Sequence, residues 1–280
     1  MFEKWLCGRF EFTLERPILM GIVNVTPDSF SDGGHHATTQ QAIAHAQRLI
    51  TEGAQILDIG GESTRPGATP VSVEDELKRV LPVMRALRDT GVAISVDTCK
   101  AEVMRAALDA GADMLNDVTG FRDPASRQVA ASHSSCGLCV MHMQGEPRTM
   151  QHAPQYENVV QDVKNYLLQQ ARLLEESGID ARRISLDPGY GFGKTLGQNY
   201  ALIKHLAEIA QAGYPVLFGV SRKSMIGTVT GQPVTQRLAG SIAAALAGVM
   251  RGAAIIRVHD VAETKDALNV WNAVEHGVTG

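Results

Sequence analysis

Short apolar runs alternate with longer amphipathic stretches along most of the chain. Each run is rich in β-branched residues and is followed by polar residues or glycine, which is typical of a buried parallel strand. Eight runs fit this pattern: Ile18–Val25, Ile56–Gly60, Ala93–Asp97, Met114–Val118, Gly137–Met141, Ile184–Asp187, Val216–Val220 and Ala254–Val258. The pattern therefore predicts a series of strand–loop–helix units.

The stretches between the runs carry helix start and stop signals. Thr38 with Gln41 three residues later matches a capping box, which predicts that a helix begins there and ends before Gly53. Ser72 is a candidate N-cap for the next helix, and Gly178 closes a later one. We interpret the apolar stripes of these helices as core packing.

Alternating strands and helices predict one α/β fold. Each helix returns the chain so that the next strand runs parallel to the last, and eight units in roughly 250 residues fit a closed (β/α)8 TIM barrel. Before the first unit, Leu6, Gly8, Phe10, Phe12 and Leu14 fall on one side of an alternating segment, which predicts a short N-terminal β-hairpin under the barrel floor. Since no linker interrupts the pattern, we expect a single domain over residues 1–280.

Composition and charge exclude several classes of protein. The 280 residues are 44% hydrophobic and 20% charged, as in an ordered globular chain. With 26 Lys+Arg against 30 Asp+Glu, the net charge of −4 argues against partners held by bulk electrostatics, so we expect neither nucleic acid nor a membrane surface as partner.

The chain also lacks the signals of an exported or membrane protein. Met1–Phe10 has no apolar segment of a signal peptide, and Leu238–Met250 is too short to span a bilayer, which takes about 20 residues. Cys136 and Cys139 form a C-x-x-C inside a predicted strand, with no second Cys/His pair at zinc spacing. We expect a cytoplasmic protein in which these cysteines have no metal or redox role.

Polar residues gather where the predicted strands end, and in a TIM barrel those ends form the active site. They are Asn24, Asp58, Asp97, Asn116, Asp117, His142, Asp187, Ser221, Arg222, Lys223, Arg257 and His259. Acids brought together in this way are costly to bury unless a ligand supplies donors, as a planar heterocycle with several N–H groups does. Arg65, Lys223, Arg257 and His259 supply charge for an anion. The pattern predicts a heterocyclic substrate that carries phosphate.

One motif imitates a nucleotide-binding loop. Pro188–Thr195 ends in Gly-Lys-Thr like a P-loop, but Pro188 occupies the position of the required first glycine. Proline cannot donate a backbone N–H there or take a positive φ. We interpret the segment as a barrel loop whose glycines let the backbone approach a ligand.

At these residues the chain resembles the dihydropteroate synthase family. The resemblance runs from about Leu6 to His259 and rests on five segments in order. They are Asn24-Val-Thr-Pro-Asp-Ser-Phe-Ser-Asp-Gly-Gly34, Asp58-Ile-Gly-Gly-Glu-Ser-Thr-Arg-Pro-Gly67, Asp187-Pro-Gly189, Ser221-Arg-Lys223 and Arg257-Val-His259. The resemblance implies condensation of 6-hydroxymethyl-7,8-dihydropterin diphosphate with 4-aminobenzoate to 7,8-dihydropteroate and pyrophosphate in folate biosynthesis, and a target for sulfonamides.

The resemblance also implies a set of site residues. The implied pterin site is Asp97, Asn116, Met141, Asp187, Phe192 and Lys223. The implied diphosphate site is Asn24, Thr64, Arg65, Arg257 and His259, with Asn24 as the protein ligand of Mg²⁺. The implied 4-aminobenzoate site is Phe30, Thr64, Arg65, Pro66, Phe192, Lys223 and Ser224. Arg65, Asp97, Lys223, Arg257 and His259 are the implied catalytic residues.

The chemistry of this reaction suits those residues. An electron-rich dihydropterin can carry positive charge on its methylene carbon, so we expect a dissociative path in which diphosphate leaves before the amine attacks. Mg²⁺, Arg65, Arg257 and His259 would stabilise the leaving group. We expect the first two loops, which carry Phe30 and Arg65, to act as lids that order once diphosphate is bound.

Three alternatives to the synthase are considered at this point. A corrinoid-linked methyltetrahydrofolate methyltransferase would use Asp97, Asn116 and Asp187, but it has no use for Thr26–Gly34, Arg65, Lys223 or the Arg257 and His259 pair. A non-catalytic pterin-binding paralogue would keep the pocket without turnover. A structural barrel without ligand would leave the acidic cluster at the rim unexplained. Family analogy implies a homodimer through the outer helices, with Leu238–Met250 as a candidate surface.

Overall fold

Parallel strands close into a barrel in the computed structural model, which describes residues 3–26, 34–63, 67–145, 150 and 154–278. Its strands are β3 (Ile18–Asn24), β4 (Ile56–Gly60), β5 (Ala93–Asp97), β6 (Met114–Asp117), β7 (Gly137–Met141), β8 (Ile184–Asp187), β9 (Val216–Phe218) and β10 (Ala253–Val258). They follow one another in chain order, and β10 pairs with β3 to close the ring. The predicted TIM barrel is confirmed, and the strand boundaries agree with the predicted runs to within two residues.

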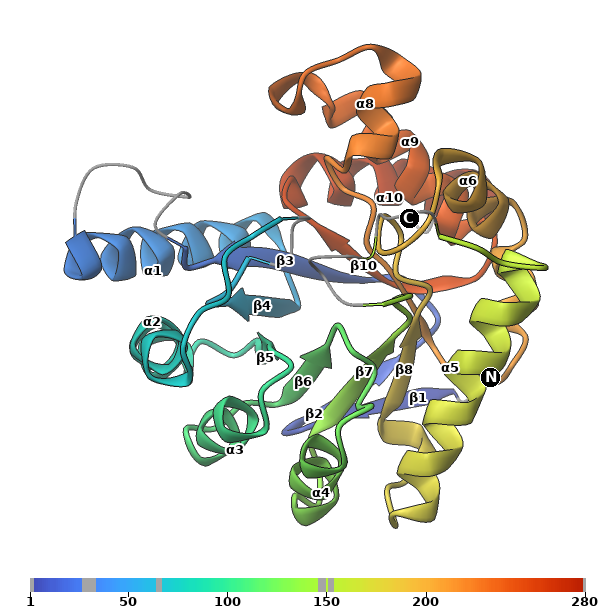
Figure 1. The fold of residues 1–280 in the computed structure, drawn as a ribbon. Helices are drawn as coiled ribbons and strands as arrows, with labels where there is room; N and C mark the ends of the chain where they lie inside the picture. The colour runs from blue at the N-terminus through green and yellow to red at the C-terminus, as the bar shows by residue number, and fades with distance from the viewer. Residues whose placement is uncertain (1–2, 27–33, 64–66, 146–149, 151–153, 279–280) are drawn as a thin grey trace.

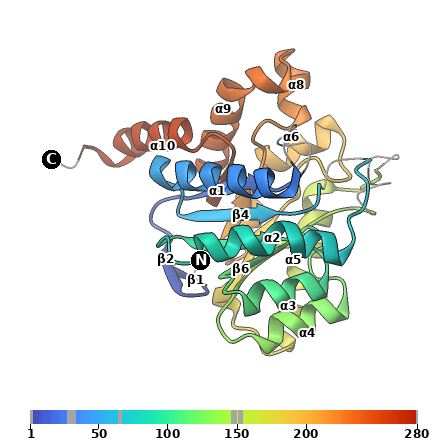
Figure 2. The same cartoon turned by 90° about the vertical axis from the view of Figure 1, so that its left-hand side faces the viewer.

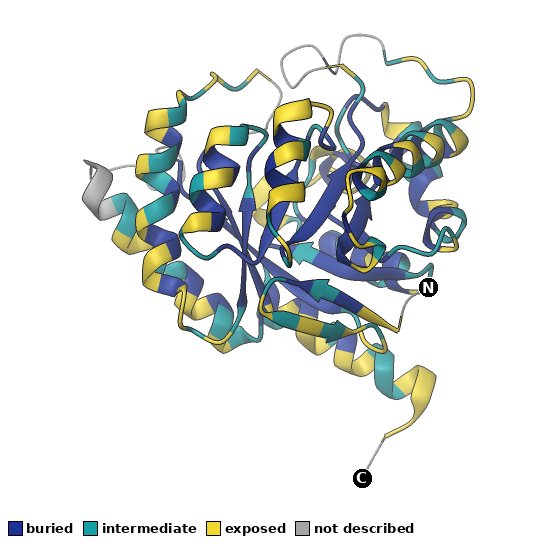
Figure 3. Cartoon of the chain, turned by 90° about the horizontal axis from the view of Figure 1, so that it is seen from below, coloured by how far each residue is buried: buried dark blue, intermediate teal, exposed yellow. Residues whose placement is uncertain are grey.

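Helices surround the barrel and follow each strand (Figure 1). They are α1 (Gly34–Glu52), α2 (Val73–Leu87), α3 (Ala101–Asp109), α4 (Pro124–Ser132), α5 (Val159–Glu176), α6 (Leu196–Lys204), α7 (Leu206–Ala210), α8 (Ser224–Thr230), α9 (Leu238–Val249) and α10 (Val261–His276). Figure 3 shows the barrel strands largely buried and the helices exposed along their outer faces. A large apolar core lies between the two layers. Within the described ranges, no helix combines the length and the apolar composition needed to cross a bilayer.

The helix signals in the sequence are confirmed at one start and wrong at another. The Ser72 side chain accepts a hydrogen bond from the backbone N–H of Asp75, so it caps α2 as predicted. Helix α1 begins at Gly34, four residues before the expected cap. Because residues 34–37 take the helical conformation, Thr38 lies inside the helix, and a residue there cannot serve as its N-cap.

An N-terminal hairpin closes the end of the barrel where the strands begin, as predicted. Strands β1 (Lys4–Cys7) and β2 (Phe10–Thr13) pair antiparallel, and Figure 2 shows them together at one end of the barrel. Trp5 and Cys7 are fully buried against the first residues of the barrel strands.

The predicted inner side of this hairpin is wrong for its first strand. Trp5 pairs with Phe12 and Cys7 with Phe10, and residues that pair across two strands lie on the same face. Even-numbered residues of β2 therefore share a face with odd-numbered residues of β1. Leu6 does not lie on that face, because the turn changes the alternation between the two strands.

The barrel interior changes from apolar to polar along its axis. Its lower layer contains Ile18, Met20, Ile56, Ala93, Met114, Cys139, Leu217 and Ile255, all buried. Since strand side chains alternate between faces, further inward positions follow at steps of two residues along each strand. These positions include Asn24, Asp58, Ser95, Asp97, Asn116, Asp187 and Arg257. The polar layer therefore lies at the carboxyl ends of the strands, where TIM barrels hold their active sites.

Candidate active site

An ionic network crosses the interior at the polar layer. Arg257 on β10 donates from Nε to Oδ2 of Asp58 over 2.6 Å and from Nη2 to Oδ2 of Asp97 over 3.1 Å. Asn116 donates from Nδ2 to the same oxygen of Asp58 over 3.0 Å, and Ser95 donates to the other oxygen over 2.7 Å. Strands β4, β5, β6 and β10 thus meet at one carboxylate. The acids and the cation that the sequence placed at separate strand ends lie in direct contact.

Burial and neighbouring charges shift the pKa values of these groups. Burial, and then the negative charge of Asp58, raise the pKa of Asp97 to about 7, although Arg257 opposes the shift. Burial also raises the pKa of Asp187, against the effects of Lys223 and the backbone N–H of Gly189. Burial lowers the pKa of Lys223 to about 8, although Asp187 partly offsets this. These groups titrate nearer neutrality than in water, as acids and amines at functional sites often do.

Asp187 and Lys223 lie on the opposite side of the interior from Asp58. Asp187, at the end of β8, is 7% exposed and accepts a hydrogen bond of 2.7 Å from the N–H of Gly189. Lys223 donates to the carbonyl of Tyr190 over 2.5 Å, and its Nζ lies 4.8 Å from the centre of the Phe192 ring, within reach of a cation–π contact. The loop after β8 therefore holds Lys223 beside an aromatic ring.

An apolar cluster borders the same rim. It contains Met141, Val118, Met143 and Met150, and Phe192 packs against it. Flexible methionine side chains and an aromatic ring form a surface suited to the face of a flat heterocycle. Met141 and Phe192, which the resemblance assigned to the pterin site, thus lie in one cluster.

The residues expected to face a diphosphate come from β3 and β10. Asn24 ends β3, and a Cβ added to Gly60 would lie 3.9 Å from its Oδ1 and 3.6 Å from Cβ of Asp97. His259 follows β10, and both its backbone N–H and its Nδ1 contact the hydroxyl of Ser221, at 3.2 and 3.1 Å. Glycine at position 60 leaves space between the amide and the carboxylate.

The remaining predicted site residues differ in how they are placed. Ser224 is the exposed first residue of α8, directly after Lys223. The other four, Phe30, Thr64, Arg65 and Pro66, lie outside the described residues, as do residues 27–33 of the first proposed lid and 64–66 of the second.

The donor atoms present fit a magnesium ion that is held mainly by substrate. In the described ranges, no three His, Cys, Asp or Glu side chains form a cluster that could hold a metal. Mg²⁺ binds oxygen and usually keeps several waters while using one or two protein ligands and substrate phosphates. The amide oxygen of Asn24 at the rim meets that requirement.

The sequence places His142 at the end of a strand but does not tell which way its side chain points. It draws attention to Lys194 only as part of the segment that imitates a P-loop. The two side chains meet in the interior, where Lys194 is 3% exposed and its Nζ lies 2.9 Å from Nδ1 of His142. Burial lowers the pKa of His142 to about 2, and Lys194 adds to the shift, so the imidazole is neutral. Lys194 also donates to the carbonyls of Gly189 and Phe192, both over 2.9 Å, which leaves its amine engaged by the loop itself rather than available to a phosphate.

We expect Lys194→Met to lower the free energy of unfolding by about 3 kcal/mol. Loss of the amine leaves buried carbonyls without a hydrogen-bond donor, and each unpaired carbonyl costs about 1–3 kcal/mol. Urea unfolding followed by circular dichroism measures the change, with Lys204→Met, an exposed lysine at the end of α6, as the matched control. Equal stability of the two variants would contradict the anchoring role of Lys194.

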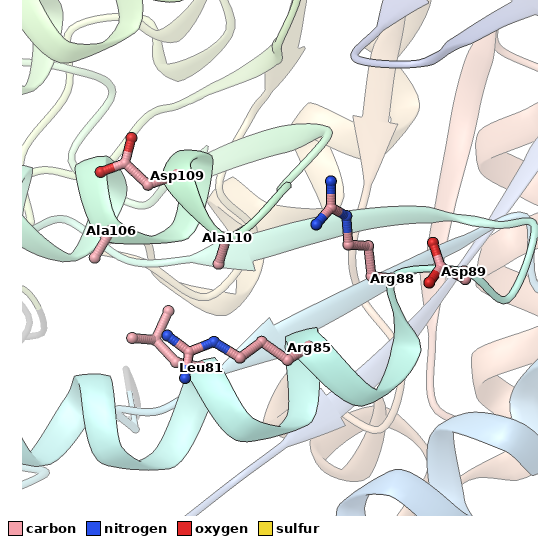
Figure 4. A pocket seen from close by; sticks show the side chains of 7 residues that line it. All are labelled: Leu81, Arg85, Arg88, Asp89, Ala106, Asp109 and Ala110. Atoms are coloured by element: carbon pink, nitrogen blue, oxygen red, sulfur yellow. The ribbon is translucent and has the colours of Figure 1, made fainter.

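A separate hollow lies on the outer wall of the barrel (Figure 4). It measures about 590 Å³ and lies between the carboxyl-terminal parts of α2 and α3, with Arg85, Arg88, Asp89 and Asp109 among its lining residues. Both helices run back toward the start of the strands, so the hollow is far from the polar layer. It contains charges of both signs, and we assign it no part in the chemistry.

Comparisons with known proteins identify a family for the chain. The family model described as "Pterin binding enzyme" matches residues 20–259. The dihydropteroate synthase of Neisseria meningitidis serogroup C is 52% identical over 274 residues, which cover 96% of this chain and 97% of that protein.

Two solved structures of similar proteins contain 4-aminobenzoic acid and 7,8-dihydropteroate, respectively. Xanthomonas albilineans dihydropteroate synthase with 4-aminobenzoic acid has a TM-score of 0.93 and 50% identity, and the match covers 99% of each chain. Burkholderia cenocepacia dihydropteroate synthase complexed with 7,8-dihydropteroate has a TM-score of 0.89 and 51% identity, with 98% of each chain covered.

Proposed function

The chain belongs to the dihydropteroate synthase family of pterin-binding enzymes, and on that premise we propose that it joins 6-hydroxymethyl-7,8-dihydropterin diphosphate to 4-aminobenzoate. The products are 7,8-dihydropteroate and pyrophosphate, so the enzyme is a transferase of folate synthesis. The contact between Arg257 and Asp97 supports this best, because it puts a cation suited to diphosphate beside an acid suited to a pterin. A single methylene carbon joins those two parts of the substrate, so their binding groups must be neighbours.

The pterin is held by the acids and amide of the polar layer. Asp97, Asn116 and Asp187 provide acceptors for the N–H groups of the ring, and ionised acids make stronger hydrogen bonds than neutral groups. Lys223 donates from the opposite side. Met141 and Phe192 supply apolar surface for the ring face.

The leaving group is stabilised by cations around the methylene carbon. The carbon–oxygen bond to diphosphate breaks first, the bonding electrons go to the diphosphate, and the dihydropterin carries the positive charge. Arg257 and His259 stabilise the departing anion, Asn24 would hold Mg²⁺, and a bound Mg²⁺ supplies further positive charge to the phosphate oxygens. Asp97 lies beside the cationic ring and offsets its charge.

The second substrate attacks the cationic carbon with its neutral amine. The contact between Phe192 and Lys223, with Ser224 next in the chain, supports a site for this substrate on the described side of the rim. Phe30, Thr64, Arg65 and Pro66 would complete this site. An arylamine is neutral at pH 7 and loses its proton after attack, so the reaction needs no strong general base.

Family membership favours the synthase over the corrinoid-linked methyltransferase. The methyltransferase would not use Arg257, which lies at the centre of the ionic network, or Lys223, which donates to the carbonyl of Tyr190. A non-catalytic paralogue differs from the synthase in turnover alone, so an activity assay separates the two.

Turnover with radiolabelled 4-aminobenzoate tests the proposal directly. We expect labelled dihydropteroate to form with the pterin diphosphate and Mg²⁺, to stop on chelation and to resume when Mg²⁺ is restored. A sulfonamide, which has the shape of 4-aminobenzoate, should compete with it. The unphosphorylated pterin serves as the control that gives no product, because it lacks the leaving group. Failure to form product from both substrates with Mg²⁺ would contradict the proposal.

We also propose that two copies associate through α8, α9 and α10, which lie next to one another in Figure 1. Helix α9 is made entirely of apolar and small residues apart from one serine, yet Leu238 and its neighbours Val234 and Met250 are exposed. A helix that is apolar all round usually lies under a cover. Sedimentation at several concentrations measures this: a dimer is expected, and a monomer at micromolar concentration would contradict it. The cytoplasmic location stays a prediction from the sequence.

A further inference from the structure

Asp58 lies in the polar layer without offering an atom to a ligand. It is 1% exposed, and donors occupy both carboxylate oxygens. Ser95 bonds Oδ1, while Asn116 and Arg257 bond Oδ2. The resemblance gave this residue no role.

The contacts of Asp58 reach across the barrel to both groups of site residues. In the ring of strands, β6 and β10 lie two strands away from β4 on either side. Asn116 on β6 belongs to the proposed pterin site, and Arg257 on β10 to the proposed diphosphate site. One carboxylate oxygen therefore joins side chains that serve the two parts of the substrate.

These contacts determine which atoms of Asn116 face a substrate. An ionised carboxylate accepts hydrogen bonds but cannot donate them, so the Nδ2 end of the Asn116 amide turns toward Asp58. The carbonyl oxygen of that amide then points elsewhere as an acceptor. An acceptor is what an N–H group on the edge of a pterin needs.

The same oxygen restrains the plane of Arg257. The guanidinium is flat and rigid, and it is held at Nε by Asp58 and at Nη2 by Asp97. Two bonds along one edge fix the rotation of the guanidinium and therefore the direction in which Nη1 points. A cation held in this way stabilises developing charge without reorganising during the reaction.

We propose that Asp58 is a positioning residue that sets the acceptor of Asn116 toward the pterin and the guanidinium of Arg257 toward the departing diphosphate. The inference rests on the proposed function and deepens it, because it assigns the coupling of the two substrate subsites to one buried carboxylate. Asp58 acts through Asn116 and Arg257 and touches neither substrate.

Two substitutions of Asp58 separate orientation from charge. Asp58→Ala removes the acceptor, and we expect about a tenfold loss of affinity for unphosphorylated 6-hydroxymethylpterin and about a 30- to 100-fold loss of kcat, as for loss of neutral and charged hydrogen bonds. Asp58→Asn keeps an oxygen for Asn116 and Arg257 while its nitrogen turns to the Ser95 hydroxyl. It should restore pterin affinity to within about threefold of the wild type but leave kcat about tenfold low, because the charge that holds Arg257 is lost.

A control distinguishes positioning from general damage to the barrel interior. Ser185 is fully buried in the same interior and donates to the carbonyl of Leu138, away from Asp58. Ser185→Ala should therefore leave kcat and pterin affinity unchanged. The Nε–H of Arg257, followed by ¹⁵N NMR, should exchange faster with water in both Asp58 variants than in the wild type.

The outcomes decide the inference separately from the proposed function. Wild-type kcat and wild-type pterin affinity in both Asp58 variants would overturn it, as would reduced stability with unchanged kcat per folded molecule. If Asp58→Ala does not fold, the kcat of Asp58→Asn and its Arg257 resonance decide the question. A wild-type enzyme without turnover would refute the proposed function, while pterin affinity and NMR exchange would still test the role of Asp58.

Discussion

Replacement of Arg257 by alanine is expected to lower kcat about 10²- to 10³-fold, the range seen when an enzyme loses one donor to developing charge. The guanidinium is the cation that the structure places against Asp97 and Asp58. Because the unphosphorylated pterin has no leaving group, its affinity should change by less than about tenfold. Steady-state turnover and calorimetry measure the two effects separately, and an equal loss of both would contradict the assigned role.

The contacts of Arg257 make a second variant necessary. Arg257→Ala leaves Asp58 and Asp97 without the cation between them, and Arg257 normally opposes the rise in the pKa of Asp97. A modest loss of pterin affinity follows from that change alone. Arg257→Lys keeps the charge but loses the flat, two-point hold, so it should recover pterin affinity while kcat stays reduced.

Replacement of Asp187 by alanine is expected to weaken pterin binding by about 2–4 kcal/mol, or roughly 30- to 1,000-fold in the dissociation constant. The carboxylate is buried beside Lys223, so in the variant the bound ring would lose a charged acceptor at a site that excludes water. Calorimetry with 6-hydroxymethylpterin gives the value. Unchanged affinity would remove Asp187 from the pterin site.

Two further variants show whether the loss comes from charge or from the loop. Asp187→Asn keeps an acceptor for the N–H of Gly189, so the loop after β8 should hold its shape while the charge is absent. Asp117→Asn alters a buried acid that bonds the backbone of Thr119 and Phe121 in its own loop. It should lower stability without lowering pterin affinity, and matching losses in the Asp117 and Asp187 variants would indicate a general effect of buried acids.

The loop after β8 illustrates a site feature that sequence reasoning did not find. The positive φ of Gly189 and the close approach of its backbone to the carbonyl of His142 leave no room for a Cβ, which would lie 1.9 Å from that oxygen. Lys194 then bonds the carbonyls around the turn. The sequence contained the glycines and the lysine, but their spacing imitated a phosphate loop, and only the direction of the lysine side chain shows what it binds.

Much of the architecture could be predicted because the signals are local. Alternation between neighbouring residues in a strand and the apolar period of a helix depend on a few residues at a time. Eight strand–helix units then imply a closed parallel barrel, and the barrel in turn implies that Asp97, Asn116, Asp187 and Arg257 meet at one rim. The acids and cations of the candidate site were therefore found from the order of the chain.

Other features needed the folded chain. The side of β1 that faces the barrel depends on its pairing with β2, and the start of α1 depends on residues before the apparent cap. Asp58 looked like one more polar strand end, yet it accepts from Arg257, which is 199 residues away along the chain.

The sequence by itself determined the strands, the barrel and the residue types at its rim, since periodicity records which face of each element is buried. Only the tertiary structure decided which rim residues bond one another and which remain for a substrate. Hydrogen-bond partners across a barrel are chosen by its closure and by the burial of charge, and neither leaves a local pattern in the chain.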